Sequence, residues 1–130
     1  MQEHAYMDNI KRITKKDPRY DVEAYIFIRE AMDFTMKKLK KPSSGKSRHI
    51  SGTELLDGIR EYAVEQFGPI TLAVLKEWGI SKTEDFGEIV FNLVESGELG
   101  RTNEDRREDF ANGYDFNEAF SKPFAPTGSN

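Results

Sequence analysis

A glycine-lysine-serine triplet is the first feature of this sequence that could do chemistry. Gly45-Lys46-Ser47 matches the end of a phosphate-binding loop, in which backbone amides cradle phosphates and the lysine reaches them. Such a loop requires a glycine five positions earlier and a preceding strand. Here that position is Lys40, and a predicted helix precedes it. The triplet therefore indicates a flexible basic linker, over about 41–49, rather than a nucleotide site.

Basic residues gather around that triplet with no acidic residue among them. They could neutralise phosphates and release counterions, contact an acidic protein, or stay solvated. Aromatic side chains that could stack on exposed bases are absent from this segment. The candidate basic patch consists of Lys37, Lys38, Lys40, Lys41, Lys46 and Arg48.

Acidic residues at helical spacing form a second candidate surface on a predicted helix over 82–96. Neighbouring carboxylates could chelate a cation or share a proton, but catalytic pairs need burial to shift their pKa values. These residues occupy the polar face of an amphipathic pattern, so we expect them to contact another protein or solvent. The candidate acidic interaction face consists of Glu84, Asp85, Glu88 and Glu95.

Composition excludes several kinds of catalytic or metal site. The chain has no cysteine, and its two histidines are His4 and His49, so a Cys/His zinc site is impossible. We therefore expect no metal, no cofactor and no enzymatic activity. The enzyme alternative would need a pocket lined by dispersed residues such as Arg29, Glu30, Tyr62 and Trp78.

The charge of the chain is unevenly distributed. The 130 residues include 19 Lys or Arg and 23 Asp or Glu, for a formal net charge of −4. Residues 1–60 carry 13 basic and 9 acidic side chains, whereas residues 61–130 carry 6 and 14. Such polarity can guide association with a charged partner. Apolar runs are too short to span a bilayer, and residues 1–4 resemble no secretory signal, so we expect a cytoplasmic protein.

Apolar periodicity and capping residues predict the elements that must position these surfaces. Asp21 can cap one helix, Ser51 with Glu54 forms a capping box for another, and Ser81 with Glu84 offers a further one. Glycines 68, 79 and 97 end helices. The expected helices cover residues 3–16, 22–40, 52–67, 69–78 and 82–96.

The sequence pattern of the C-terminal part predicts a β-hairpin. Leu99, Phe110, Tyr114 and Phe116 are flanked by turn residues, with the charged run 103–109 between them. Capped helices followed by a two-stranded ribbon are typical of a winged helix, so the fold prediction is a mainly α single domain over 1–120 with four to five helices and a small β-hairpin. Its C-terminal half would resemble a winged helix, and a mobile tail would follow over 121–130.

Several long stretches carry a resemblance to a known family. They are residues 17–20 (DPRY), 24–31 (AYIFIREA), 48–56 (RHISGTELL), 65–69 (EQFGP), 77–80 (EWGI) and 83–93 (TEDFGEIVFNL). Together they resemble a bacterial family of conserved hypothetical proteins described chiefly in the Planctomycetes–Verrucomicrobia group. The resemblance covers roughly residues 10–120. It implies a bacterial cytoplasmic setting and brings no activity, ligand or site residue.

Charge decides between the functions that this predicted fold would allow. The helix over 82–96 would be the DNA-recognition helix, but its acidic face would meet phosphates on both walls of a major groove. We therefore expect a non-enzymatic module that binds another protein. The alternative is binding of nucleic acid, RNA rather than specific DNA, through the basic residues of 37–48.

Overall fold

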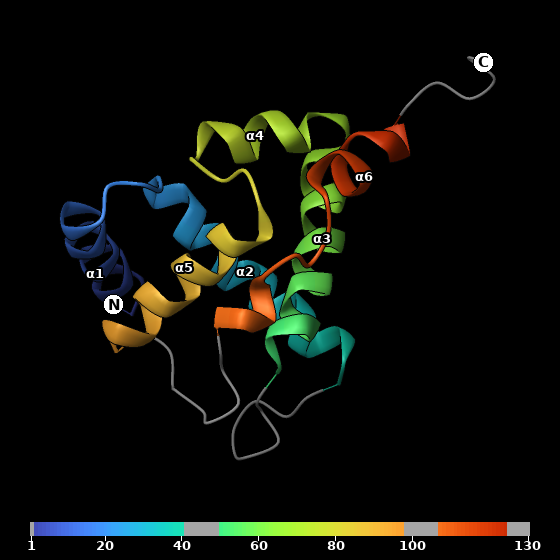
Figure 1. The fold of residues 1–130 in the computed structure, drawn as a ribbon. Coiled ribbons are helices and arrows are strands. Elements are labelled where there is room, and N and C mark those ends of the chain that lie inside the picture. The colour runs from blue at the N-terminus through green and yellow to red at the C-terminus, as the bar shows by residue number, and fades with distance from the viewer. Residues whose placement is uncertain (1, 41–49, 98–106, 125–130) are drawn as a thin grey trace, which may run out of the picture.

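The structure is a computed structural model, which describes residues 2–40, 50–97 and 107–124 (Figure 1). All of the regular secondary structure in these ranges is helical, which confirms the prediction of a mainly helical chain. None of the described helices is long and apolar enough to cross a membrane. The α-helices are α1 (Gln2–Lys16), α2 (Val22–Lys38), α3 (Gly52–Phe67), α4 (Thr71–Glu77), α5 (Thr83–Glu95) and α6 (Phe116–Phe120). Short 3₁₀ turns are η2 (Gly68–Ile70), η3 (Arg107–Phe110) and η4 (Lys122–Phe124).

Local capping explains where the long helices begin. The Asp21 carboxylate accepts a hydrogen bond from the Glu23 amide, at 2.8 Å, at the start of α2. At the start of α3, the Ser51 hydroxyl accepts from the Glu54 amide at 3.1 Å. The Glu54 carboxylate in turn accepts from the Ser51 amide at 2.8 Å. Both predicted caps are therefore confirmed.

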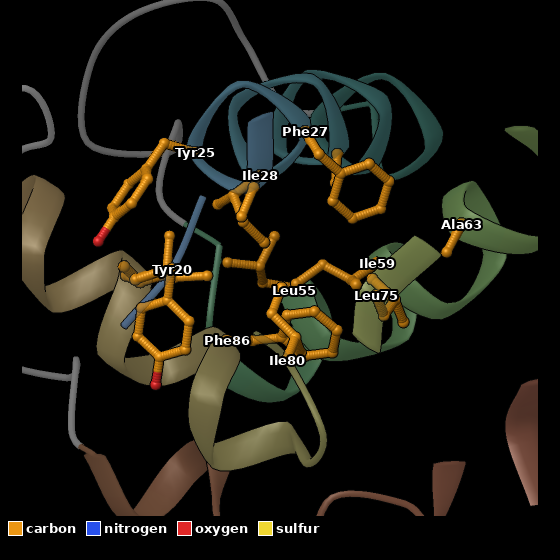
Figure 2. Packing of buried hydrophobic residues seen from close by; sticks show 14 of the residues in the cluster. Tyr20, Tyr25, Phe27, Ile28, Leu55, Ile59, Ala63, Leu75, Ile80 and Phe86 are labelled. Atoms are coloured by element: carbon orange, nitrogen blue, oxygen red, sulfur yellow. The ribbon is translucent and has the colours of Figure 1, made fainter. Parts of the chain in front are cut away.

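The helices pack around one apolar core. Helices α2 and α3 form the most extensive contact, and α5 lies against α1, α2 and α3. Figure 1 shows α4 running across one end of this group, with α6 beside it and beside α3. Figure 2 shows side chains of α2, α3, α4 and α5 meeting in the core, among them the fully buried Ile28, Ile59, Leu75 and Phe86.

The predicted β-hairpin and the winged-helix resemblance are wrong. No strand is present in the described ranges: of the residues assigned to the hairpin, Phe110 ends η3, Tyr114 lies between η3 and α6, and Phe116 begins α6. Asp115 caps α6 by accepting a hydrogen bond from the Glu118 amide at 3.1 Å. Phe116 and Phe120 lie one helical turn apart and are both buried. The aromatic spacing that suggested alternation along a strand is thus the buried face of a short capped helix.

Part of the predicted hairpin, linker and tail falls outside the described residues. The hairpin's first strand and most of its charged tip lie within 98–106. The linker over 41–49 also lies outside the described ranges, as does the tail from residue 125 onward. Of the predicted tail, Lys122–Phe124 forms η4, which follows α6 closely and packs against it.

Gly79, which follows α4, lies directly against the turn between α1 and α2. Gly79 has a φ of +88°, a left-handed conformation that side-chain-bearing residues rarely adopt. A side chain there would also collide with the backbone carbonyl of Arg19. The Asp21 amide donates to the Trp78 carbonyl at 3.2 Å in the same place. The predicted helix stop at Gly79 is therefore also a point of close backbone approach.

Candidate functional site

The predicted basic patch lies at the C-terminal end of α2, as far as the structure describes it. Lys37, Lys38 and Lys40 are exposed there, and Lys38 forms an ion pair with Glu61 of α3. Nucleic-acid binding through this region stays a prediction, because half of the patch lies outside the described ranges. Those residues are Lys41, Lys46 and Arg48.

Two members of the predicted acidic interaction face contact the turn between α1 and α2. The hydroxyl of Tyr20 donates a hydrogen bond to the Asp85 carboxylate at 2.6 Å. Burial, reinforced by this bond, raises the pKa of Tyr20 above its ordinary value. The Arg19 guanidinium donates to the Glu88 carboxylate at 3.2 Å. A partner that bound these two carboxylates would therefore compete with bonds inside the chain.

The other two acidic residues lie toward opposite ends of α5. Glu84 accepts a hydrogen bond from the Asn112 amide at 3.2 Å, and Glu95 is exposed near the C-terminal end. Asp85 also accepts from the amides of Ser81 and Lys82, at 2.9 and 3.3 Å, just before α5 begins. The structure therefore places Glu84 and Asp85 in bonds that organise the start of α5, whereas Glu95 faces solvent. The use of this face for binding stays a prediction.

A polar cluster connects the α1–α2 turn to α5. The Arg19 side chain donates two bonds to the Asp17 carboxylate, at 2.8 and 2.6 Å. The Asn92 side-chain amide donates to Asp17 at 3.0 Å and to the Tyr25 hydroxyl at 2.9 Å. The bonds from Arg19, with the one from Asn92, hold the pKa of Asp17 well below its usual range despite partial burial. These charged and polar residues therefore link the α1–α2 turn to α5, which is far away in the sequence, and we call them the clamp.

This clamp predicts a pH-dependent stability. Because the pKa of Asp17 is depressed in the folded protein, its ionised carboxylate stabilises the fold. This contribution to the unfolding free energy is complete above the unfolded pKa of about 4 and is lost as the pH falls below about 4. We expect Asp17→Asn to lower the unfolding free energy by about 1 kcal/mol at pH 7, since the exposed guanidinium is screened. The difference from wild type should shrink toward pH 2 in urea titrations. Arg19→Gln should reproduce this convergence, and a gap that stays constant from pH 7 to pH 2 would contradict the assignment.

Of the four residues considered for an enzyme pocket, Glu30, Tyr62 and Trp78 lie near one another, whereas Arg29 lies against Tyr6. Glu30 accepts a hydrogen bond from the Tyr62 hydroxyl at 3.1 Å, and Trp78 lies among aromatic rings nearby. Arg29 instead lies over the ring of Tyr6, 4.5 Å from its centroid, on the side of α2 that faces α1. A 370 Å³ depression there includes Arg29 and Glu30 but neither Tyr62 nor Trp78. In the described ranges, no three His, Asp or Glu side chains gather where they could hold a metal.

An open apolar groove lies between α4 and the α6–η4 segment. Its volume is about 720 Å³, and Lys76 and Lys122 stand at its edge. The Lys122 ammonium is bonded to Glu118 at 2.6 Å. Phe124, which lines the groove, is 37% exposed, and Ile70, which follows the lining residue Pro69 in the chain, is 60% exposed. The apolar lining consists of Pro69, Leu72, Ala73, Phe120 and Phe124.

Sequence reasoning missed this groove for an identifiable reason. Asp115 followed three residues later by Glu118 is the signature of a helix start, and it would have predicted α6. No comparable local signal places Phe124 at the groove, because α6 ends at Phe120 and Phe124 belongs to the separate turn η4. Both residues lay instead near or within the segment assigned to a mobile tail.

Comparison with known proteins adds no relative. No protein-family model matches the chain, and neither a curated protein nor a solved structure does. The resemblance to a bacterial family of conserved hypothetical proteins is therefore neither supported nor refuted.

Proposed function

We propose that this chain is a non-enzymatic module that binds another protein through the groove between α4 and α6. The observation that carries the proposal is the exposure of large apolar side chains at this groove. Of the three exposed large hydrophobic residues in the described ranges, Phe124 lines the groove, and Ile70 follows the lining residue Pro69 in the chain. Contiguous exposed apolar surface rimmed by polar groups is typical of protein interaction sites. The proposal keeps the bacterial, cytoplasmic setting expected from the sequence.

The shape and lining of the groove favour an amphipathic helical segment as the bound element. Leu72 and Phe120 provide an apolar base, and a helix can insert apolar residues spaced by three or four positions into such a groove. Lys76 and Lys122 can extend their aliphatic stems along that helix while keeping their ammonium groups in water. Acidic residues flanking the apolar positions of the partner would complement Lys76, because Lys122 is already bonded to Glu118.

A matched pair of variants tests this proposal. Ile70→Glu places a charge beside the groove, and Leu39→Glu makes the same kind of change at the C-terminal end of α2, where Leu39 is 38% exposed. We expect Ile70→Glu to reduce partner recovery from a lysate of the source organism at least about tenfold, because a buried unpaired charge is costly at an interface. Leu39→Glu should retain the partner. Quantitative affinity purification with mass spectrometry measures both.

Three outcomes would contradict the proposal. One is equal recovery of every partner by Ile70→Glu and by wild type. Another is recovery that disappears after nuclease treatment, which would indicate binding of nucleic acid through the basic patch. The third is concentration-dependent dimerisation in analytical ultracentrifugation that Ile70→Glu abolishes, because the groove would then bind a second copy of the chain.

A further inference from the structure

A row of aromatic rings crosses the surface where α2, α3 and α4 meet. The Phe27 ring centroid lies 5.5 Å from that of Tyr62, 5.7 Å from Phe67 and 5.5 Å from Trp78. At one end, the Phe34 and Tyr62 centroids are 5.3 Å apart. Phe27 is buried, as its position in Figure 2 shows, whereas the other four rings are half-buried and keep part of their surface in solvent. We call these five rings the aromatic row.

Carboxylates border the aromatic row around Tyr62. Glu30 accepts a hydrogen bond from the Tyr62 hydroxyl, and Asp33 and Glu65 are exposed on the adjoining turns of α2 and α3. Burial and the negative charge of these three side chains raise the pKa of Tyr62. Lys38 is held at the edge by its ion pair with Glu61. The field around Tyr62 is therefore that of carboxylates, whereas Lys37 and Lys38 of the basic patch follow Phe34 within about one turn of α2.

The chain itself contains an arginine bound by the same combination of groups. The Arg19 guanidinium lies 5.1 Å from the Tyr20 ring centroid while it pairs with Asp17 at 2.6 Å and Glu88 at 3.2 Å. A planar guanidinium can stack on a ring and bond carboxylates at the same time, which an ammonium does less well. In the ranges that the structure describes, no Lys or Arg lies over a ring of the aromatic row.

We propose that the aromatic row and its bordering carboxylates bind an arginine-rich segment of a partner protein. Guanidinium groups would stack on the exposed faces of Phe34 and Tyr62 and pair with Glu30, Asp33 and Glu65. This site is separate from the groove, because α4 presents Leu72 to the groove and Trp78 to the row. It therefore goes beyond the proposed function and does not depend on it. RNA would be repelled by the carboxylates.

The one tryptophan of the chain makes this proposal directly measurable. Trp78 lies in the row, in contact with Phe27 and Phe67, so its fluorescence responds to binding at this surface. Trp78 also lines a depression beside Arg19 and Tyr20, so a response is assigned to the row by the variants described below. We expect an octapeptide of alternating glycine and arginine to change Trp78 emission saturably. The matching lysine peptide should bind more weakly, and the matching glutamate peptide should leave the emission unchanged.

Charge reversals on two acidic surfaces supply the decisive comparison. Asp33→Lys and Glu65→Lys, both at exposed positions, should each weaken arginine-peptide binding at least about fivefold. Glu95→Lys changes the net charge equally at the end of α5 and should leave the affinity unchanged. Circular dichroism melts confirm that the variants are folded. Absence of an emission change at millimolar peptide, equal weakening by Glu95→Lys, or a Trp78 response to single-stranded RNA would each overturn the proposal.

Discussion

Replacing Gly58 with alanine is expected to lower the unfolding free energy by about 2–3 kcal/mol, the cost of overpacking a filled core. Gly58 lies where α3 crosses α2, and an added Cβ would fall 2.8 Å from the Cβ of Thr35 and closer still to its hydroxyl. Thr35 is 2% exposed, and its hydroxyl donates to the Ala31 carbonyl at 2.7 Å, so it has little room to move. The melting temperature should fall by roughly 10 °C.

The sign of this effect distinguishes packing from helix propensity. Alanine is a better helix former than glycine by about 1 kcal/mol, so propensity alone predicts stabilisation. Adding Thr35→Ala removes the nearest atom but keeps Cβ, so the double variant should recover only part of the loss. Urea unfolding of Gly58→Ala, Thr35→Ala and the double variant measures the coupling. A Gly58→Ala protein as stable as wild type would show that the two helices lie farther apart than described.

Replacing Thr83 with valine is expected to cost about 2–4 kcal/mol, because two backbone groups lose their partner at once. Thr83 is 1% exposed at the start of α5. Its hydroxyl donates to the Phe110 carbonyl at 2.6 Å and accepts from the Gly113 amide at 3.0 Å. Valine has nearly the same shape without the hydroxyl, so the loss reports on these bonds. Urea unfolding measures the change.

The consequences of Thr83→Val should extend to the groove. The bonded segment between Phe110 and Gly113 leads directly into α6, which supplies Phe120 to the groove. Amide hydrogen exchange over 107–124 should therefore accelerate more than exchange over α2 and α3. Thr83→Ser keeps the hydroxyl and should retain slow exchange, with a loss of about 1 kcal/mol for the deleted methyl group. Equal stability of the valine and serine variants would contradict this role of the hydroxyl.

Functional surfaces were harder to predict than helices because polar patterns do not show which side chains are already bonded to other residues of the chain. Asp85 and Glu88 have the spacing of a solvent-facing helix surface, yet they bond to Tyr20 and Arg19 from the turn between α1 and α2. Their partners lie more than 60 residues away along the chain. No pattern in the sequence indicated that Ile70 would be exposed, although its exposed fraction is 60%. Exposure of a given apolar residue depends on which helices cover it.

Sequence by itself determined where the long helices begin and end, because those signals act over three or four residues. The Asp21 cap, the Ser51–Glu54 capping box and the glycine after α4 are of this kind. The predicted Ser81 box was displaced, since Asp85 rather than Glu84 bonds back to the residues before α5. Composition likewise excluded cysteine-based sites outright.

Only the tertiary structure decided what the segment after η3 became and which surfaces remain open. The spacing of Phe110, Tyr114 and Phe116 is compatible with a strand, and Asp115 with Glu118 favours a helix start, so local preferences conflict there. Contacts with α5 and α3 resolve the conflict: Thr83 bonds Phe110, and Tyr114 donates to the Leu56 carbonyl at 2.8 Å. Burying the aromatic rings and satisfying these backbone groups together requires the helical path, which is a property of the packed chain rather than of any short window.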